Sequence, residues 1–125
     1  SGRGDKFNIK YKKNRKTVVI DDSYNANPTS MRAALYDFYK IKTKFSNYQK
    51  ILIIGDMLEL GGKSSQMHLE LIPILEKIKP DLLLTLGKDS KIINDQLKLT
   101  INSQWLFDFL NLLSFVLQVE IGLLH

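Results

Sequence analysis

The sequence predicts an α/β fold: one domain with an open, mostly parallel β-sheet and helices on both faces. Two continuous apolar runs, residues 51–54 and 82–86, are typical of strands that are covered on both sides. Segments with helical spacing of apolar residues separate the strands, as expected of a parallel sheet. The 125 residues, 44% of them hydrophobic and 25% charged, suffice for a single domain spanning residues 1–125.

The first part of the chain is expected to form an N-terminal antiparallel hairpin. Residues 7–11 and 17–20 have strand character, and the segment between them contains the densest basic cluster of a chain with net charge +5. The cluster could contact nucleic acid. It has no interleaved stacking or base-reading residues, however, so we expect a solvated hairpin and no nucleic-acid partner. Its members are Lys10, Lys12, Lys13, Arg15 and Lys16.

The segment 20–31 leads from a strand through a polar loop into a helix. Asp21 and Asp22 end an apolar run, Asn27 suits the helix N-cap, and Pro28 suits the first helical position. Such a loop favours anionic or hydroxyl-rich ligands. Capping alone also accounts for Asn27 and Pro28, so the pattern leaves a ligand-free turn open.

The later elements continue the alternation of helices and strands. Apolar residues three and four apart predict a helix from Pro28 to about residues 45–47. Pro73 predicts a kink in the next helix, because it removes one helical hydrogen bond. The remaining expected bounds are 64–78 for that helix, 82–86 for a strand, 89–97 for a helix, 104–117 for a largely buried helix and 119–124 for a last strand.

Three loops follow predicted strands, at residues 21–27, 55–62 and 87–90. Ligands of parallel sheets bind beyond the carboxyl ends of the strands, so we expect a site where these loops meet.

Several kinds of chemistry are absent from the sequence. There is no cysteine, which excludes disulfides and thiolates and fits a reducing compartment. No Walker-type phosphate loop and no dinucleotide fingerprint is present. The two histidines, His68 and His125, do not form a metal pair, and His68 alone is compatible with a structural role. We find no secretory signal and expect no membrane insertion.

The acidic pair at Asp21 and Asp22 is similar to the magnesium-binding pair of phosphoacceptor receiver domains. The strand at 82–86, however, ends without the aspartate that would accept the phosphoryl group. A degenerate receiver-like domain is therefore the less favoured alternative.

Two motifs in the correct order resemble the C-terminal domain of the Mur ligases. They are DSYNANP (22–28), followed by SMRAAL (30–35), and GDMLELG (55–61), followed by a helix with His68. The motifs are most similar to members that add D-alanyl-D-alanine (D-Ala-D-Ala) to UDP-N-acetylmuramoyl-tripeptide (UDP-MurNAc-tripeptide). The resemblance runs from Gly2 to about Gly87 and implies a Rossmann-like fold.

By this resemblance, the chain takes part in peptidoglycan biosynthesis in the bacterial cytoplasm. The family joins a carboxylate to an amine through an acyl-phosphate, at the expense of ATP. An N-terminal domain would bind the UDP-sugar, and a central domain would bind most of the ATP and Mg²⁺. Both domains are missing here, so the isolated chain is expected to be inactive, with no catalytic or metal-binding residue of its own. The alternative is a non-catalytic remnant or split-subunit module.

The resemblance also implies roles for individual residues. Arg3 would approach the nucleotide phosphates or ribose, and Asp22 would accept from ribose hydroxyls. The end of the chain, residues 119–125, departs from the Lys-Gly-Ser type segment of the family, so we expect an incomplete domain there. The implied nucleotide-side residues are Arg3, Asp22, Tyr24, Asn25 and Asn27, and the substrate-side candidates are Glu59 and His68.

Overall fold

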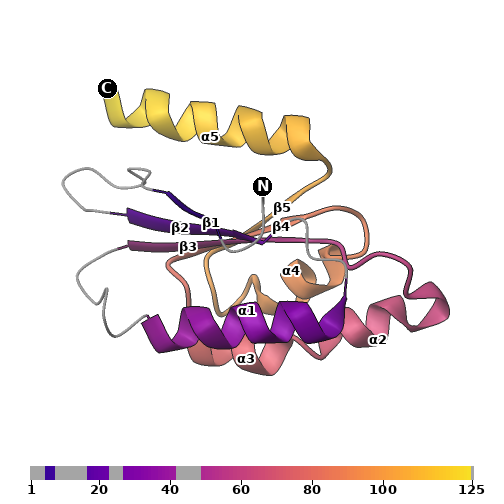
Figure 1. Ribbon diagram of the computed structural model, residues 1–125. Helices are drawn as coiled ribbons and strands as arrows, with labels where there is room; N and C mark the ends of the chain where they lie inside the picture. The colour runs from indigo at the N-terminus through magenta and orange to yellow at the C-terminus, as the bar shows by residue number, and fades with distance from the viewer. Residues whose placement is uncertain (1–4, 8–16, 23–26, 42–48, 125) are drawn as a thin grey trace.

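The computed structural model describes residues 5–7, 17–22, 27–41 and 49–124 (Figure 1). Expected features that fall on other residues lie outside the described part of the chain; these include the basic cluster and the end of the first helix near residues 45–47. The elements are β1 (Asp5–Phe7), β2 (Thr17–Asp22), α1 (Pro28–Ile41), β3 (Gln49–Gly55), the 3₁₀ helix η1 (Gly61–Lys63), α2 (Ser64–Leu69), α3 (Ile72–Ile78), β4 (Leu82–Leu86), α4 (Lys91–Leu97), β5 (Ser103–Leu106) and α5 (Phe109–Leu124).

The five strands form one sheet in the order β1-β2-β3-β4-β5. Strands β2 to β5 are parallel, and β1 pairs antiparallel with β2. The predicted mostly parallel α/β sheet is therefore confirmed. The expected N-terminal hairpin is not: β1 is shorter and earlier than the strand predicted at 7–11, and the connection at 8–16 lies outside the described residues.

Helices cover both faces of the sheet, as predicted (Figure 1). Each parallel strand lies next to the preceding one, and right-handed crossovers in a constant direction place their helices on one face. Accordingly α1, α3 and α4 lie on the same side of the sheet, while α5 lies on the opposite side. None of the described helices is both long and apolar enough to cross a membrane.

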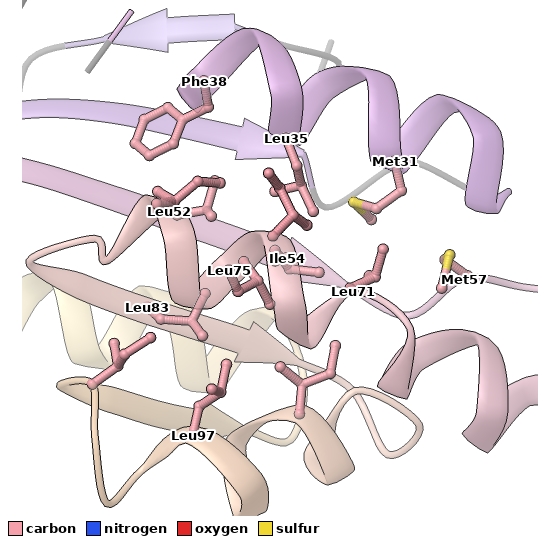
Figure 2. Close-up of a cluster of buried hydrophobic side chains, with 14 residues drawn as sticks. Met31, Leu35, Phe38, Leu52, Ile54, Met57, Leu71, Leu75, Leu83 and Leu97 are labelled. Carbon is pink, nitrogen blue, oxygen red and sulfur yellow. The ribbon is translucent and has the colours of Figure 1, made fainter. Parts of the chain in front are cut away.

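The main core lies between the sheet and α1, α3 and α4 (Figure 2). Alternate residues of β3 point to opposite faces: Leu52 and Ile54 enter this core, and Ile51 and Ile53 enter a smaller one under α5. Burial on both faces explains why the run at 51–54 is continuously apolar. The larger core includes Met31, Leu35, Phe38, Leu52, Ile54, Met57, Leu71, Leu75, Leu83 and Leu97.

The expected single helix at 64–78 is wrong in one respect, because the chain forms two helices, α2 and α3, in its place. Pro73 lies in the first turn of α3. Proline has no N–H, and its ring would clash with the carbonyl of Leu69, so a continuous helix is broken here instead of kinked. The first turn of a new helix tolerates proline well.

The prediction for the last part of the chain is also wrong. Residues 103–106 form β5, parallel to β4, and residues 119–124 belong to α5 and do not form a strand. The Asp108 carboxylate accepts from the Asn111 backbone N–H at 3.0 Å, an N-cap that starts α5 at Phe109. The helix is not largely buried either, since several of its large apolar side chains are exposed, namely Phe109, Leu110, Leu113 and Leu117.

Candidate functional site

The strands that precede the expected loops meet at the carboxyl edge of the sheet. In the parallel register, Asp22 pairs with Ile54, Gly55 pairs with Leu86, and Leu86 pairs with Leu106. The strands β2, β3, β4 and β5 therefore end side by side. We call the segments that follow them the β2 loop (23–27), the β3 loop (56–60) and the β4 loop (87–90).

The β2 loop ends in the predicted helix cap. The Asn27 Oδ1 accepts from the Ser30 backbone N–H at 2.8 Å, and the Asn27 carbonyl accepts from the Met31 N–H at 3.1 Å. Capping by Asn27 is thus confirmed, and Pro28 is the first residue of α1. Asp22 is the last residue of β2. Arg3, Tyr24 and Asn25 lie outside the described residues, so the ligand roles of this group stay predictions.

The β3 loop has a buried beginning and an exposed middle. Met57 is buried, whereas Leu58 and Glu59 are exposed. Glu59 has φ 61°, a left-handed conformation that costs a non-glycine residue about 1–2 kcal/mol. Contacts elsewhere in the loop must therefore fix this backbone.

One of these contacts comes from His68, which is fully buried on α2. Its Nε2 accepts from the Met57 backbone N–H at 3.0 Å, and its Nδ1 lies 2.7 Å from the Ser64 carbonyl oxygen. A nitrogen that accepts from an N–H carries no proton, and a carbonyl only accepts. The imidazole is therefore neutral, with its proton on Nδ1. Both ring nitrogens bond to backbone, so the geometry favours an indirect role for His68; contact of Glu59 or His68 with substrate stays a prediction.

A second contact joins the β3 loop to the β4 loop through Asp56. Its carboxylate accepts from the backbone N–H of Ser90 at 2.6 Å and of Asp89 at 3.2 Å. Gly87 lies against the same carboxylate: a Cβ at Gly87 would be 2.5 Å from the Asp56 Cγ, and its φ is +107°. Only glycine fits at position 87 while Asp56 keeps these bonds.

Asp56 is a residue that the sequence analysis missed. The available signal was a carboxylate directly after a buried strand, the same pattern that drew attention to Asp22.

The β4 loop is in turn joined to β5. The carbonyl oxygen of Gly87 accepts from the Trp105 Nε1–H at 2.7 Å and from the Ser90 hydroxyl at 3.1 Å. The Lys91 Nζ lies 5.6 Å from the centre of the Trp105 ring, within cation–π range. A network of side-chain-to-backbone bonds thus holds three consecutive strand ends in one arrangement.

The described residues at this edge supply hydrogen-bonding groups, carboxylates and the cations of Lys88 and Lys91. Nowhere among them do three histidine, cysteine, aspartate or glutamate side chains gather in a way that could hold a metal ion. The arrangement is suited to positioning a polar ligand against another surface, since its backbone is fixed and its exposed tip carries Glu59.

Comparison with known proteins identifies the family. The family model described as "Mur ligase, glutamate ligase domain" matches residues 7–114. Three similar curated proteins all bear the name UDP-N-acetylmuramoyl-tripeptide–D-alanyl-D-alanine ligase. The one from Bacillus subtilis is 39% identical over 71 residues, which are 56% of this chain and 15% of the relative. The one from Rickettsia prowazekii is 38% identical over 96 residues, 77% of this chain and 19% of the relative.

The relative from Escherichia coli is 35% identical over 77 residues, 62% of this chain and 16% of the relative. The chain thus spans less than a fifth of the length of these relatives, and no solved structure matches it with significance. The match of the family model covers most of the 125 residues, including the β2, β3 and β4 loops. The chain therefore belongs to the Mur ligase family, as the C-terminal domain of that family.

Proposed function

We propose that this chain is the C-terminal domain of an ATP-dependent ligase that joins D-Ala-D-Ala to UDP-MurNAc-tripeptide. The observation that carries the proposal is that β2 and β3, whose last residues begin the two family motifs, are neighbouring parallel strands that end side by side at one edge of the sheet. The names of the relatives support the substrate assignment, since all three carry this activity.

The proposed division of work follows from what the residues can do. Phosphoryl transfer to the tripeptide carboxylate needs a phosphate cradle and Mg²⁺. The 125 residues contain no Walker-type loop, so we assign ATP activation and Mg²⁺ to domains outside this segment. The present domain would close over the site from the other side, and by itself it would be inactive.

The β2 loop would supply the nucleotide side of that closure. Arg3 would form a bidentate contact with phosphate or approach the ribose, and Asp22 would accept from ribose hydroxyls. Tyr24, Asn25 and Asn27 would lie in the same cleft. The exposed tip of the β3 loop, with Glu59, would face the amine of the incoming dipeptide. Such an enzyme would work in the bacterial cytoplasm, where its nucleotide substrates are.

One observation favours a second candidate, a non-catalytic remnant or split-subunit module. The match to the family model ends at residue 114, within α5, and the helix continues to Leu124. From residue 115 on, the apolar helix has no match in the family model, and a chain that departs from the family there fits a module that does not carry a dipeptide site.

A reconstitution assay separates the two candidates. The chain would be fused to the N-terminal and central domains of the Bacillus subtilis relative, and phosphate release would be measured with ATP, UDP-MurNAc-tripeptide and D-Ala-D-Ala. The proposal expects release that depends on both peptide substrates from the fusion and none from the chain alone. The control is the same two domains with their own C-terminal domain. An active control beside an inactive fusion would replace the ligase proposal by the non-catalytic module.

A further inference from the structure

The β3 loop is held on both sides of its exposed tip. Asp56 bonds to the β4 loop, and Met57 bonds through its backbone N–H to His68. The next two residues, Leu58 and Glu59, are exposed, and Glu59 has the left-handed φ of 61°. The conformation of the tip therefore depends on how firmly the residue before it is fixed.

His68 can fix Met57 in one tautomer only. The distances of 3.0 Å from the Met57 N to Nε2 and 2.7 Å from Nδ1 to the Ser64 carbonyl oxygen require the proton to be on Nδ1. The other tautomer would set two N–H donors against each other at Met57 and two acceptors, Nδ1 and the Ser64 carbonyl oxygen, against each other on the opposite side of the ring. The Ser64 carbonyl, four residues earlier on the same helix, thus keeps the proton on Nδ1 and leaves Nε2 able to accept from the loop.

We propose that His68, in its Nδ1–H tautomer, is a positioning residue that acts through the Met57 N–H to hold the Leu58–Glu59 tip in its binding conformation. Contact between this tip and D-Ala-D-Ala rests on the ligase function proposed above. The positioning itself does not, because it follows from contacts within this chain.

Two amide substitutions separate positioning from simple core filling. In His68→Gln, the amide oxygen can take the place of Nε2 and accept from the Met57 N–H. In His68→Asn, the shorter amide can take the place of Nδ1 and bond to the Ser64 carbonyl, but nothing reaches Met57. Both variants bury a neutral amide at the same site. The matched control is Ser64→Ala, which removes a hydroxyl 3.3 Å from Nδ1 and keeps the carbonyl.

The first test uses the 125-residue chain. Imidazole ¹⁵N chemical shifts report the tautomer, and we expect the Nδ1–H form in the parent and in Ser64→Ala. Amide hydrogen exchange should quicken at residues 57–60 in His68→Asn by about tenfold or more relative to core amides such as that of Leu83, with little local change in His68→Gln. An Nε2–H tautomer, or exchange that quickens equally at all amides in His68→Asn, would overturn the proposal.

The second test uses the reconstituted ligase. His68→Asn should raise the KM for D-Ala-D-Ala by about tenfold and leave the KM for ATP unchanged, whereas His68→Gln should stay close to the parent. Equal KM values for D-Ala-D-Ala in the two variants would refute the positioning of a substrate contact. If the parent fusion is inactive, the proposed function fails, and the tautomer and exchange measurements still decide whether His68 holds the loop.

Discussion

On one face of the sheet, α1, α3 and α4 each contribute several buried side chains, while α5 on the other face contributes one among its described side chains, Leu112. Phe38 on α1 is 1% exposed, whereas Phe109 on α5 is 57% exposed. Both helices have enough apolar residues to build a core. The two faces therefore differ in how those residues are arranged and not in how many there are.

The difference comes from the pattern around each helix. In α1 the buried positions Met31, Leu35 and Phe38 form one stripe, and the remaining surface includes Arg32 and Asp37. In α5 the polar side chains Asn111, Ser114 and Gln118 form only a narrow stripe, and apolar side chains occupy most of the remaining circumference, so the contrast between its faces is weak. A helix is oriented against a sheet by the difference in polarity between its faces, and this difference is small in α5.

The largest expected effect on stability comes from truncating the two phenylalanines, Phe38 and Phe109. Phe38→Ala should lower the free energy of unfolding by about 3–5 kcal/mol, because it leaves a cavity in the main core. Phe109→Ala should change it by less than about 0.5 kcal/mol, since most of that ring is already in water. Urea unfolding followed by circular dichroism measures both. Similar losses in the two variants would contradict the asymmetry.

The next effect tests the packing of Gly87 against Asp56. Gly87→Ala should lower the free energy of unfolding by about 2–3 kcal/mol, because a Cβ would meet the carboxylate at 2.5 Å and φ is +107°. Gly62→Ala is the control, since a Cβ there meets nothing within 4 Å. Adding Asp56→Gly to Gly87→Ala should relieve part of the loss. If the losses of the two single variants simply add in the double variant, residues 56 and 87 are not in direct contact.

A smaller loss of folding stability is expected when the Asp56 carboxylate is replaced by a neutral amide. Asp56→Asn weakens two charge-assisted bonds to the start of α4, and we expect a loss of about 1.5–2 kcal/mol. The control, Asp95→Asn, removes a half-exposed ion pair with Lys91 and should cost no more than about 0.5 kcal/mol. Thermal unfolding compares them. A loss in Asp56→Asn as small as in the control would assign the carboxylate no structural role.

The smallest effect concerns Asn27. Asn27→Ala removes the side-chain cap of α1 and should cost about 1 kcal/mol, while Asn27→Ser keeps a capping oxygen and should be close to neutral. Measuring the KM for ATP in the reconstituted ligase then separates the two readings of this residue. A normal KM in Asn27→Ser leaves capping as its whole role, and a raised KM adds a ligand contact.

Local patterns were enough to predict much of this fold. The continuous runs of β3 and β4 and the stripe of α1 identify buried elements without any knowledge of their partners. The meeting of the loops at one edge also follows from parallel strands alone.

The parts that failed depend on contacts distant in sequence. β5 is only four residues long, and its strand character comes from pairing with β4. The bonds of Asp56 reach 33 and 34 residues along the chain, and the bond from the Met57 N–H to His68 spans 11 residues. No periodicity in the sequence encodes such bonds.

The bond from Trp105 to the Gly87 carbonyl gives the domain a built-in optical probe. Trp105 is the single tryptophan of the 125 residues, and its indole N–H is bonded to the β4 loop at the edge of the sheet where both motifs begin. Its emission colour and quenching depend on that bond and on the Lys91 ammonium above the ring. Docking of a ligand or a neighbouring domain at this edge can therefore be followed by intrinsic fluorescence, with no label attached.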